Sequence, residues 1–176
     1  MRRVLCCALL AVVALAAAPL AAGTTKTPTQ RESSLEQGIL REANRVRVSF
    51  GLRPLALSRA LQAAAAFQSR VLLEQGLFDH DTAAGGTFGS RLRRFYPVSG
   101  ARAWSVGENL LWSSDGIDAQ NAVKMWLDSP PHRRNLLDPT WREFGVAALN
   151  TPSAAGVYAA AGQVVVVTMD FGTRTR

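Results

Sequence analysis

The sequence contains very little cysteine. Both cysteines, Cys6 and Cys7, lie near the start of the chain, so the remainder can form no disulfide and offers no cysteine nucleophile. No serine lies in a recognisable nucleophile turn either. Stability must therefore come from packing and hydrogen bonds, and covalent catalysis has no evident residue to use.

Long apolar runs are also scarce, apart from one at the N-terminus. Residues 4–18 are almost entirely apolar, two arginines precede them, and small residues at 21–23 offer a cleavage site. This layout predicts a secretory signal peptide over residues 1–23, with both cysteines inside it. A membrane span needs about 20 apolar residues, so an uncleaved anchor is the weaker alternative. We expect a secreted or periplasmic protein without a transmembrane anchor after cleavage.

The chain is basic, and its positive charge is nearly all arginine. Removal of residues 1–23 leaves 153 residues, enough for one domain, and lowers the net charge from +7 to +5. The densest basic groups are 91–94 and 133–134, and no aromatic stacking motif accompanies them. We interpret them as a solvated basic surface. A lipid, a glycan or an envelope protein is the expected partner, and nucleic acid is not.

The first half of the mature chain predicts two helices. Residues 24–33 are polar and aperiodic and are predicted to be a flexible leader. Ser33 and Glu36 fit a capping box at the start of a helix that Gly51 closes. A second helix is predicted over residues 59–75, capped by Ser58 and ended by a glycine.

The second half predicts a mixture of helices and strands. A short helix is expected at 88–95, an extended segment at 103–112, and a third helix capped by Asp115 and ended by two prolines. Strands are expected at 144–149 and 163–171, the latter buried on both faces because its valines do not alternate with polar residues. Helices first and strands last predict an α+β sandwich with a small antiparallel sheet.

Three residues stand out as able to carry chemistry. His80 and His132 are the two histidines of the chain, and Glu108 lies between apolar neighbours. Two imidazoles and one carboxylate can bind a transition metal with a position open for water, or can transfer protons. The intervals of 28 and 24 residues form no local motif, so each could equally be a surface or structural residue. Only the fold could bring them together.

A set of short motifs adds to this pattern through its order and spacing. The segments are Phe78-Asp79-His80, Gly107-Glu108-Asn109-Leu110, 126–137 with Ser129-Pro130-Pro131-His132, Phe144-Gly145-Val146 and Asp170-Phe171-Gly172. Together they resemble the bacterial branch of the CAP superfamily of cysteine-rich secretory, antigen and pathogenesis-related proteins, over roughly residues 35–172. We therefore place a CAP-like domain at 34–174.

The resemblance implies a three-layer α-β-α sandwich with a broad cleft. In the family, two histidines and two acidic residues line this cleft and sometimes hold a divalent cation such as zinc. Three of the four are matched here, and Ser129 stands where animal members have a glutamate. Glu143 and Asp170 are further acids that nothing in the sequence ties to the cleft. The metal set implied is His80, Glu108 and His132, and the ligand-binding set is His80, Glu108, Asn109, Ser129, His132 and Asn135.

Two function classes remain open at this point. The first is a binding module that holds a lipid, glycan or protein at the cleft and requires no cofactor. The second is a hydrolase of envelope or extracellular material, in which His80 or His132 activates water, directly or through a metal, and Glu108 orients the imidazole. These histidines are therefore the candidate catalytic residues, together with Glu108. A purely structural envelope protein would need no cleft chemistry.

Overall fold

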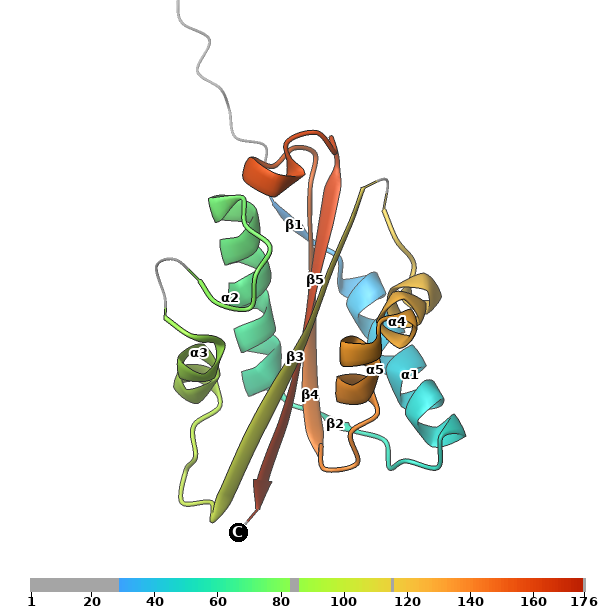
Figure 1. Ribbon diagram of the computed structural model, residues 1–176, viewed down its shortest axis with the longest axis vertical. Helices are drawn as coiled ribbons and strands as arrows, with labels where there is room; N and C mark the ends of the chain where they lie inside the picture. Colours follow the sequence, from blue (N-terminus) through green and yellow to red (C-terminus); the bar gives the residue numbers. More distant parts are fainter. Residues whose placement is uncertain (1–28, 83–85, 115, 176) are drawn as a thin grey trace, which may run out of the picture.

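A computed structural model describes residues 29–82, 86–114 and 116–175 (Figure 1). The predicted signal peptide and the first half of the predicted leader, residues 24–28, lie outside these residues. None of the described helices is long and apolar enough to cross a membrane.

The described residues form one five-stranded sheet with strand order β1-β4-β5-β3. These pairs are antiparallel, and β2 adds a short parallel pairing to β4. The antiparallel pairing of β4 with β5 agrees with the small antiparallel sheet expected from the sequence. The strands are β1 (Gln30–Arg31), β2 (Ala56–Leu57), β3 (Ala103–Ser114), β4 (Glu143–Thr151) and β5 (Val164–Thr175).

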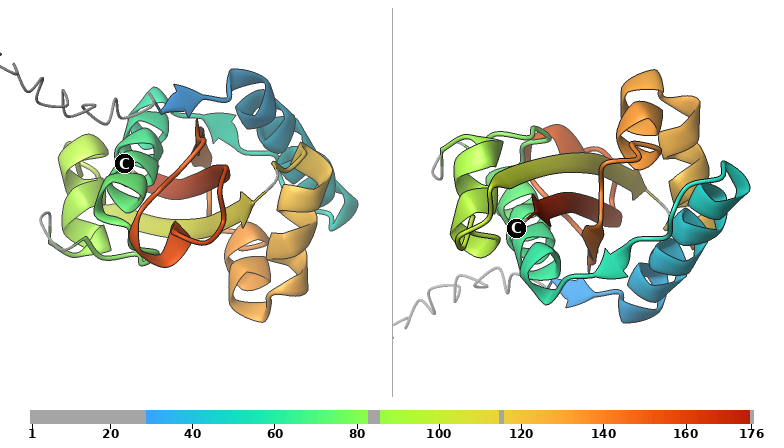
Figure 2. Two further views of the ribbon diagram at one scale, coloured as in Figure 1. Left: turned by 90° about the horizontal axis from the view of Figure 1, so that it is seen from above. Right: turned by 90° about the horizontal axis from the view of Figure 1, so that it is seen from below.

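Helices cover both faces of this sheet. Helices α2 and α3 lie on one face, and α1, α4 and α5 lie on the other, as the two end-on views also show (Figures 1 and 2). The predicted α+β fold with three layers is therefore confirmed. The helices are α1 (Ser33–Ser49), α2 (Arg59–Gln75), α3 (Phe88–Phe95), α4 (Ala119–Asp128) and α5 (Pro130–Leu136), with a 3-10 turn η1 at Gly156–Tyr158.

Strand β5 lies in the middle of the core. Successive side chains of a strand point to opposite faces. Val164 and Val166 accordingly pack with Leu72 of α2, whereas Val165 and Val167 join the cluster formed with α1 and α4. This burial on both faces confirms the interpretation of the uninterrupted valine run.

The start of the domain differs from the prediction. Gln30–Arg31 pair with β4, so the last residues of the predicted flexible leader belong to the sheet. The predicted capping box is wrong, because Glu36 turns inward instead of closing the helix end. Its carboxylate accepts a hydrogen bond from the Ala148 backbone N–H at 3.1 Å and pairs with Arg31. Glu36 therefore fastens α1 and β1 to the sheet.

The region around the double proline also differs from the prediction. Asp118 caps α4 by accepting a hydrogen bond from the Asn121 N–H at 2.8 Å, and Asp115 lies outside the described residues. The prolines end α4 as expected, but they also begin α5, which the sequence analysis did not predict. Proline is favoured in a first helical turn, since its missing N–H has no partner there. Helix α5 carries His132.

Candidate functional site

Glu108 lies at the centre of a buried network on the α2 and α3 face of the sheet. Its side chain is almost completely buried. One oxygen, Oε1, lies 2.8 Å from Nδ1 of His80, and the other accepts a short hydrogen bond from Arg91. Glu108 therefore joins β3 to α3 and to the loop between α2 and α3. A buried carboxylate needs such partners, because an unpaired charge in the interior is strongly unfavourable.

Arg91 holds the histidine loop in place. Its guanidinium is buried and donates to Oε1 of Gln68 at 2.7 Å and to the backbone carbonyl of His80 at 2.9 Å. The Gln68 amide in turn donates to the carbonyl of Asp79 at 2.9 Å. The interpretation of Arg91 as part of a solvated basic surface is therefore wrong, whereas its neighbours Arg93 and Arg94 are exposed.

His80 is oriented by Glu108. Since Nδ1 faces a carboxylate, this nitrogen carries a proton, and Nε2 remains available on the half-exposed side of the ring. The hydrogen bond to Glu108 raises the pKa of His80, and burial opposes that shift. Phe88 packs against the ring edge-on with a centroid distance of 6.5 Å. A carboxylate-oriented imidazole of this kind can donate a hydrogen bond or transfer a proton.

His132 approaches the same region from the other face of the sheet. Burial lowers its pKa, and the nearby charge of His80 lowers it further, so the two imidazoles interact. Its backbone carbonyl accepts a hydrogen bond from the Asn109 amide at 3.0 Å. The fold therefore brings both histidines to the edge strand β3. This proximity is the condition that a shared site of His80 and His132 must meet.

Two asparagines fix this edge. The Asn135 amide donates to the carbonyl of Glu108 and to Oδ1 of Asn109, both at 3.0 Å. Trp126 donates its indole N–H to the next outward carbonyl of β3, that of Leu110, at 3.1 Å. The asparagines thus bind backbone and each other, which fixes α5 against β3 beside His132.

A groove of about 260 Å³ runs beside His132 along β3 and α4. Its walls are mostly apolar and include large side chains, two of which, Phe78 and Met125, are substantially exposed. Ser129 and His132 are the polar residues of its lining. The lining residues are Phe78, Leu110, Leu111, Trp112, Met125, Trp126, Ser129 and His132.

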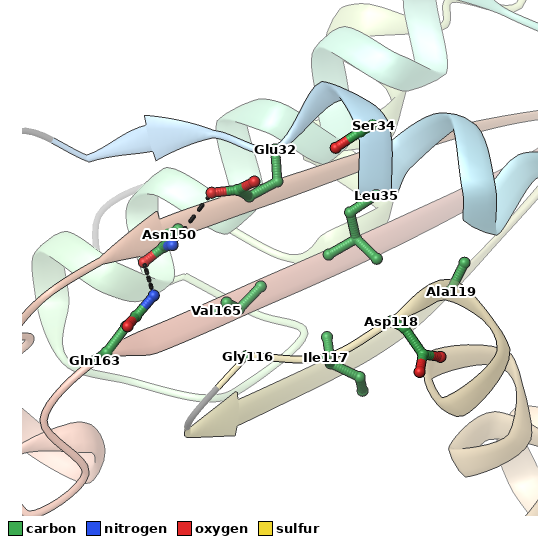
Figure 3. A pocket seen from close by; sticks show the side chains of 10 residues that line it. All are labelled: Glu32, Ser34, Leu35, Gly116, Ile117, Asp118, Ala119, Asn150, Gln163 and Val165. Carbon is green, nitrogen blue, oxygen red and sulfur yellow. Dashed lines mark hydrogen bonds between the residues drawn. The ribbon is translucent and has the colours of Figure 1, made fainter.

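A second hollow, of about 390 Å³, lies between the start of α1 and the segment that enters α4 (Figure 3). The Asn150 amide bridges Glu32 and Gln163 across it, with hydrogen bonds of 3.1 and 3.2 Å. Neither histidine lines this hollow. It is therefore separate from the site predicted by the sequence.

The three-residue metal set of the sequence analysis does not fit this geometry. No three histidine, cysteine, aspartate or glutamate side chains of the described chain are placed to hold a metal ion. Both oxygens of Glu108 already contact Arg91 and His80. Glu108 thus acts on the imidazole and does not face the groove.

Of the extra acids noted in the sequence, one reaches the site and one does not. Asp170 lies on β5 directly opposite Glu108. Glu143 instead accepts a short hydrogen bond from the Tyr96 hydroxyl at a distance from the histidines. The sequence analysis missed Arg91, Gln68 and Asp170 as parts of the site. For Asp170, the only sequence signal was an acidic residue directly following a run of buried strand residues.

The fold and the site define a small α-β-α domain with two histidines at the edge of its sheet. The family model of the cysteine-rich secretory protein family, CAP, matches residues 40–171. The chain belongs to this family.

Related proteins come from several bacteria. The Bacillus subtilis protein YkwD, described as uncharacterized, is 28% identical over 139 residues, which are 77% of this chain and 52% of that protein. The chain thus spans about half the length of this relative. An extracellular protein of Bacillus anthracis with an SCP domain is 28% identical, with a TM-score of 0.62 over 82% of this chain and 41% of that one. An outer surface protein of Borrelia burgdorferi shares the fold at 18% identity, with a TM-score of 0.66 over 85% of this chain and 99% of its own.

The two imidazoles are expected to titrate on opposite sides of their ordinary pKa. Nuclear magnetic resonance should show the pKa of His80 above 6.5 and that of His132 below it. Because the folded pKa of His80 is raised, its protonation stabilises the fold below the unfolded pKa, and this contribution disappears as the pH rises through the folded pKa. Glu108→Gln should lower the pKa of His80.

Glu42→Gln is the matched control for this titration, because it removes a carboxylate that pairs with Arg45 at the surface of α1. It should leave both histidine curves unchanged. A His80 curve that does not move in Glu108→Gln would contradict the role of Glu108 in orienting the ring.

Proposed function

We propose that this protein is a secreted binding domain whose groove holds the apolar part of a ligand while His80 and His132 contact its polar part. Of the ligand classes expected from the sequence, the apolar walls favour a lipid or a lipid-bearing molecule over a bare glycan. The proposal requires no cofactor. Export is supported by the signal-peptide pattern at residues 1–23 and by the extracellular and outer-surface relatives.

The observation that carries the proposal is that His132 lines the mostly apolar groove and lies close enough to His80 for the charge of His80 to lower its pKa. The apolar lining of the groove includes Leu110, Trp112 and Met125, and its polar lining residues are Ser129 and His132. Concave, mostly apolar sites with a few fixed polar groups are typical of small-molecule binding. The buried carboxylate behind His80 keeps that ring in one orientation without occupying the groove.

The binding test uses a dansyl-labelled fatty acid as the probe. Met125→Glu places a charge among the apolar walls of the groove, so it should weaken probe binding. We expect a loss of about tenfold or more in affinity, which corresponds to about 1.4 kcal/mol or more. Val48→Glu is the matched control, because Val48 is an exposed apolar residue of α1 outside the groove. Equal probe affinity in the two variants would contradict the groove as the binding site. Native mass spectrometry of protein purified from its host envelope would then identify the natural ligand.

A hydrolase is the alternative, and the Glu108–His80 contact at 2.8 Å is the observation that favours it. In that case His80 would accept a proton from water at Nε2 while Glu108 stabilises the charged ring. The two functions differ in the behaviour of one variant. His80→Ala should weaken probe binding if the imidazole contacts the ligand, whereas in a hydrolase it should abolish ester cleavage and leave binding largely intact.

A further inference from the structure

Asp170 is a fully buried carboxyl group without a hydrogen-bond partner. Its side chain is inaccessible to solvent, and neither oxygen has a partner among the described residues. An ionised carboxylate in such a place would lose its hydration and gain no hydrogen bond in return. The protonation state of Asp170 is therefore the main unexplained feature of the site.

The register of the strands places the Asp170 carboxyl beside that of Glu108. The two residues are directly opposite each other in the antiparallel pair of β3 and β5. The carbonyl of Glu108 accepts a hydrogen bond from Asn135 and so points away from β5. Such residues form a non-hydrogen-bonded pair, the kind whose side chains come closest, with Cα atoms about 4.5 Å apart. Both side chains lie on the face covered by α2 and α3.

The charges around this pair do not suffice for two carboxylates. Arg91 from α3 is the buried cation, and it already donates to Glu108. His80, from the loop before α3, is the other ionisable group that contacts Glu108. Strand β4 presents Gly145 opposite Asp170, which has no side chain, and α2 presents the neutral Gln68. Neither Arg91 nor His80 donates a hydrogen bond to Asp170, so a second anion would be buried without a partner among the described residues.

We propose that Asp170 keeps its proton in the folded protein and donates it to the Glu108 carboxylate, as a positioning residue for His80. Three donors from three elements then hold one carboxylate: Arg91, Asp170 and His80. Burial raises the pKa of Asp170 well above its ordinary value, and the charge of Glu108 acts in the same direction. The inference concerns the site of the proposed function, but its tests use ligand-free protein, so either can fail alone.

The first test is Asp170→Asn, which replaces a neutral donor by a neutral donor of similar shape. In urea unfolding, the variant and the wild type should be equally stable at about pH 3, where the unfolded aspartate is also protonated. As the pH rises, the unfolded wild type loses a proton that the folded protein keeps. Its folding equilibrium constant should therefore fall relative to the variant by up to about tenfold per pH unit.

Two further results of this variant bear on the proposal. The pKa of His80 should be unchanged in Asp170→Asn, because no charge is removed. A fall in the pKa of His80, or a variant that becomes less stable than wild type as the pH rises, would show that Asp170 is ionised and would overturn the proposal. Asp128→Asn, an exposed carboxylate paired with Lys124, is the control and should show neither pH-dependent effect.

A second measurement needs no variant. Carboxyl-carbon resonances of labelled wild-type protein should show Asp170 in its protonated form at neutral pH, with Glu108 ionised. A resonance of ionised Asp170 at neutral pH would overturn the proposal, even if Asp170→Asn failed to fold.

Discussion

Replacement of Arg91 by alanine is expected to lower the free energy of unfolding by about 3–5 kcal/mol, the typical cost of removing one partner of a buried ion pair. The guanidinium is 4% exposed and serves Glu108, Gln68 and the carbonyl of His80 at once. Its loss leaves the Glu108 carboxylate buried without its arginine partner. Urea unfolding at neutral pH measures the change.

Arg70→Ala is the control for this substitution. Arg70 is an exposed arginine of α2, and its loss should change the free energy of unfolding by less than about 0.5 kcal/mol. If Arg91→Ala were no more destabilising than Arg70→Ala, the buried network would not be essential to the fold. We also expect the loop that carries His80 to exchange its amide hydrogens faster in Arg91→Ala, since the carbonyl of His80 loses its Arg91 donor and Gln68, which donates to Asp79, loses its own partner.

Trp126→Ala should be about as destabilising, by about 3–5 kcal/mol, because it removes a large side chain from a close-packed core. Trp126 is 1% exposed and packs in the main cluster between α4 and the sheet. Its indole also donates to the carbonyl of Leu110, so the substitution releases part of β3 beside the groove. Thermal or urea unfolding measures the loss.

Two related variants separate the contributions of Trp126. Trp126→Phe retains most of the packing but lacks the N–H, and it should cost about 1 kcal/mol for the hydrogen bond plus a smaller packing loss. Met125→Ala changes the neighbouring, exposed residue and should be nearly neutral for stability. A Trp126→Ala variant as stable as Met125→Ala would contradict the packing described for α4.

The helices and strands were predicted correctly where a local sequence signal was enough to define them. Helix α2 begins after Ser58 and ends at Gly76, whose backbone is left-handed, as the cap and terminator signals indicated. The valine run became the central strand β5. The start of α1 was misjudged because the helix-start signal could not reveal that Glu36 faces β4, more than a hundred residues later.

The site was predictable only in part, for the same physical reason. The motif resemblance located His80, Glu108 and His132, and the fold gathers them at β3. Arg91 could not be told apart from its exposed neighbouring arginines, because the sequence does not show which side of α3 faces the sheet. Asp170 became part of the site only through the register of β3 and β5, which depends on pairing over more than sixty residues.

The position of β3 at the end of the strand order has a consequence for contacts between molecules. An open strand edge can recruit a strand from another chain and so begin aggregation. Here Trp126 and Asn135 already occupy two successive outward carbonyls, those of Leu110 and Glu108. The middle of the strand is thereby closed to a foreign backbone by the same side chains that shape the histidine region.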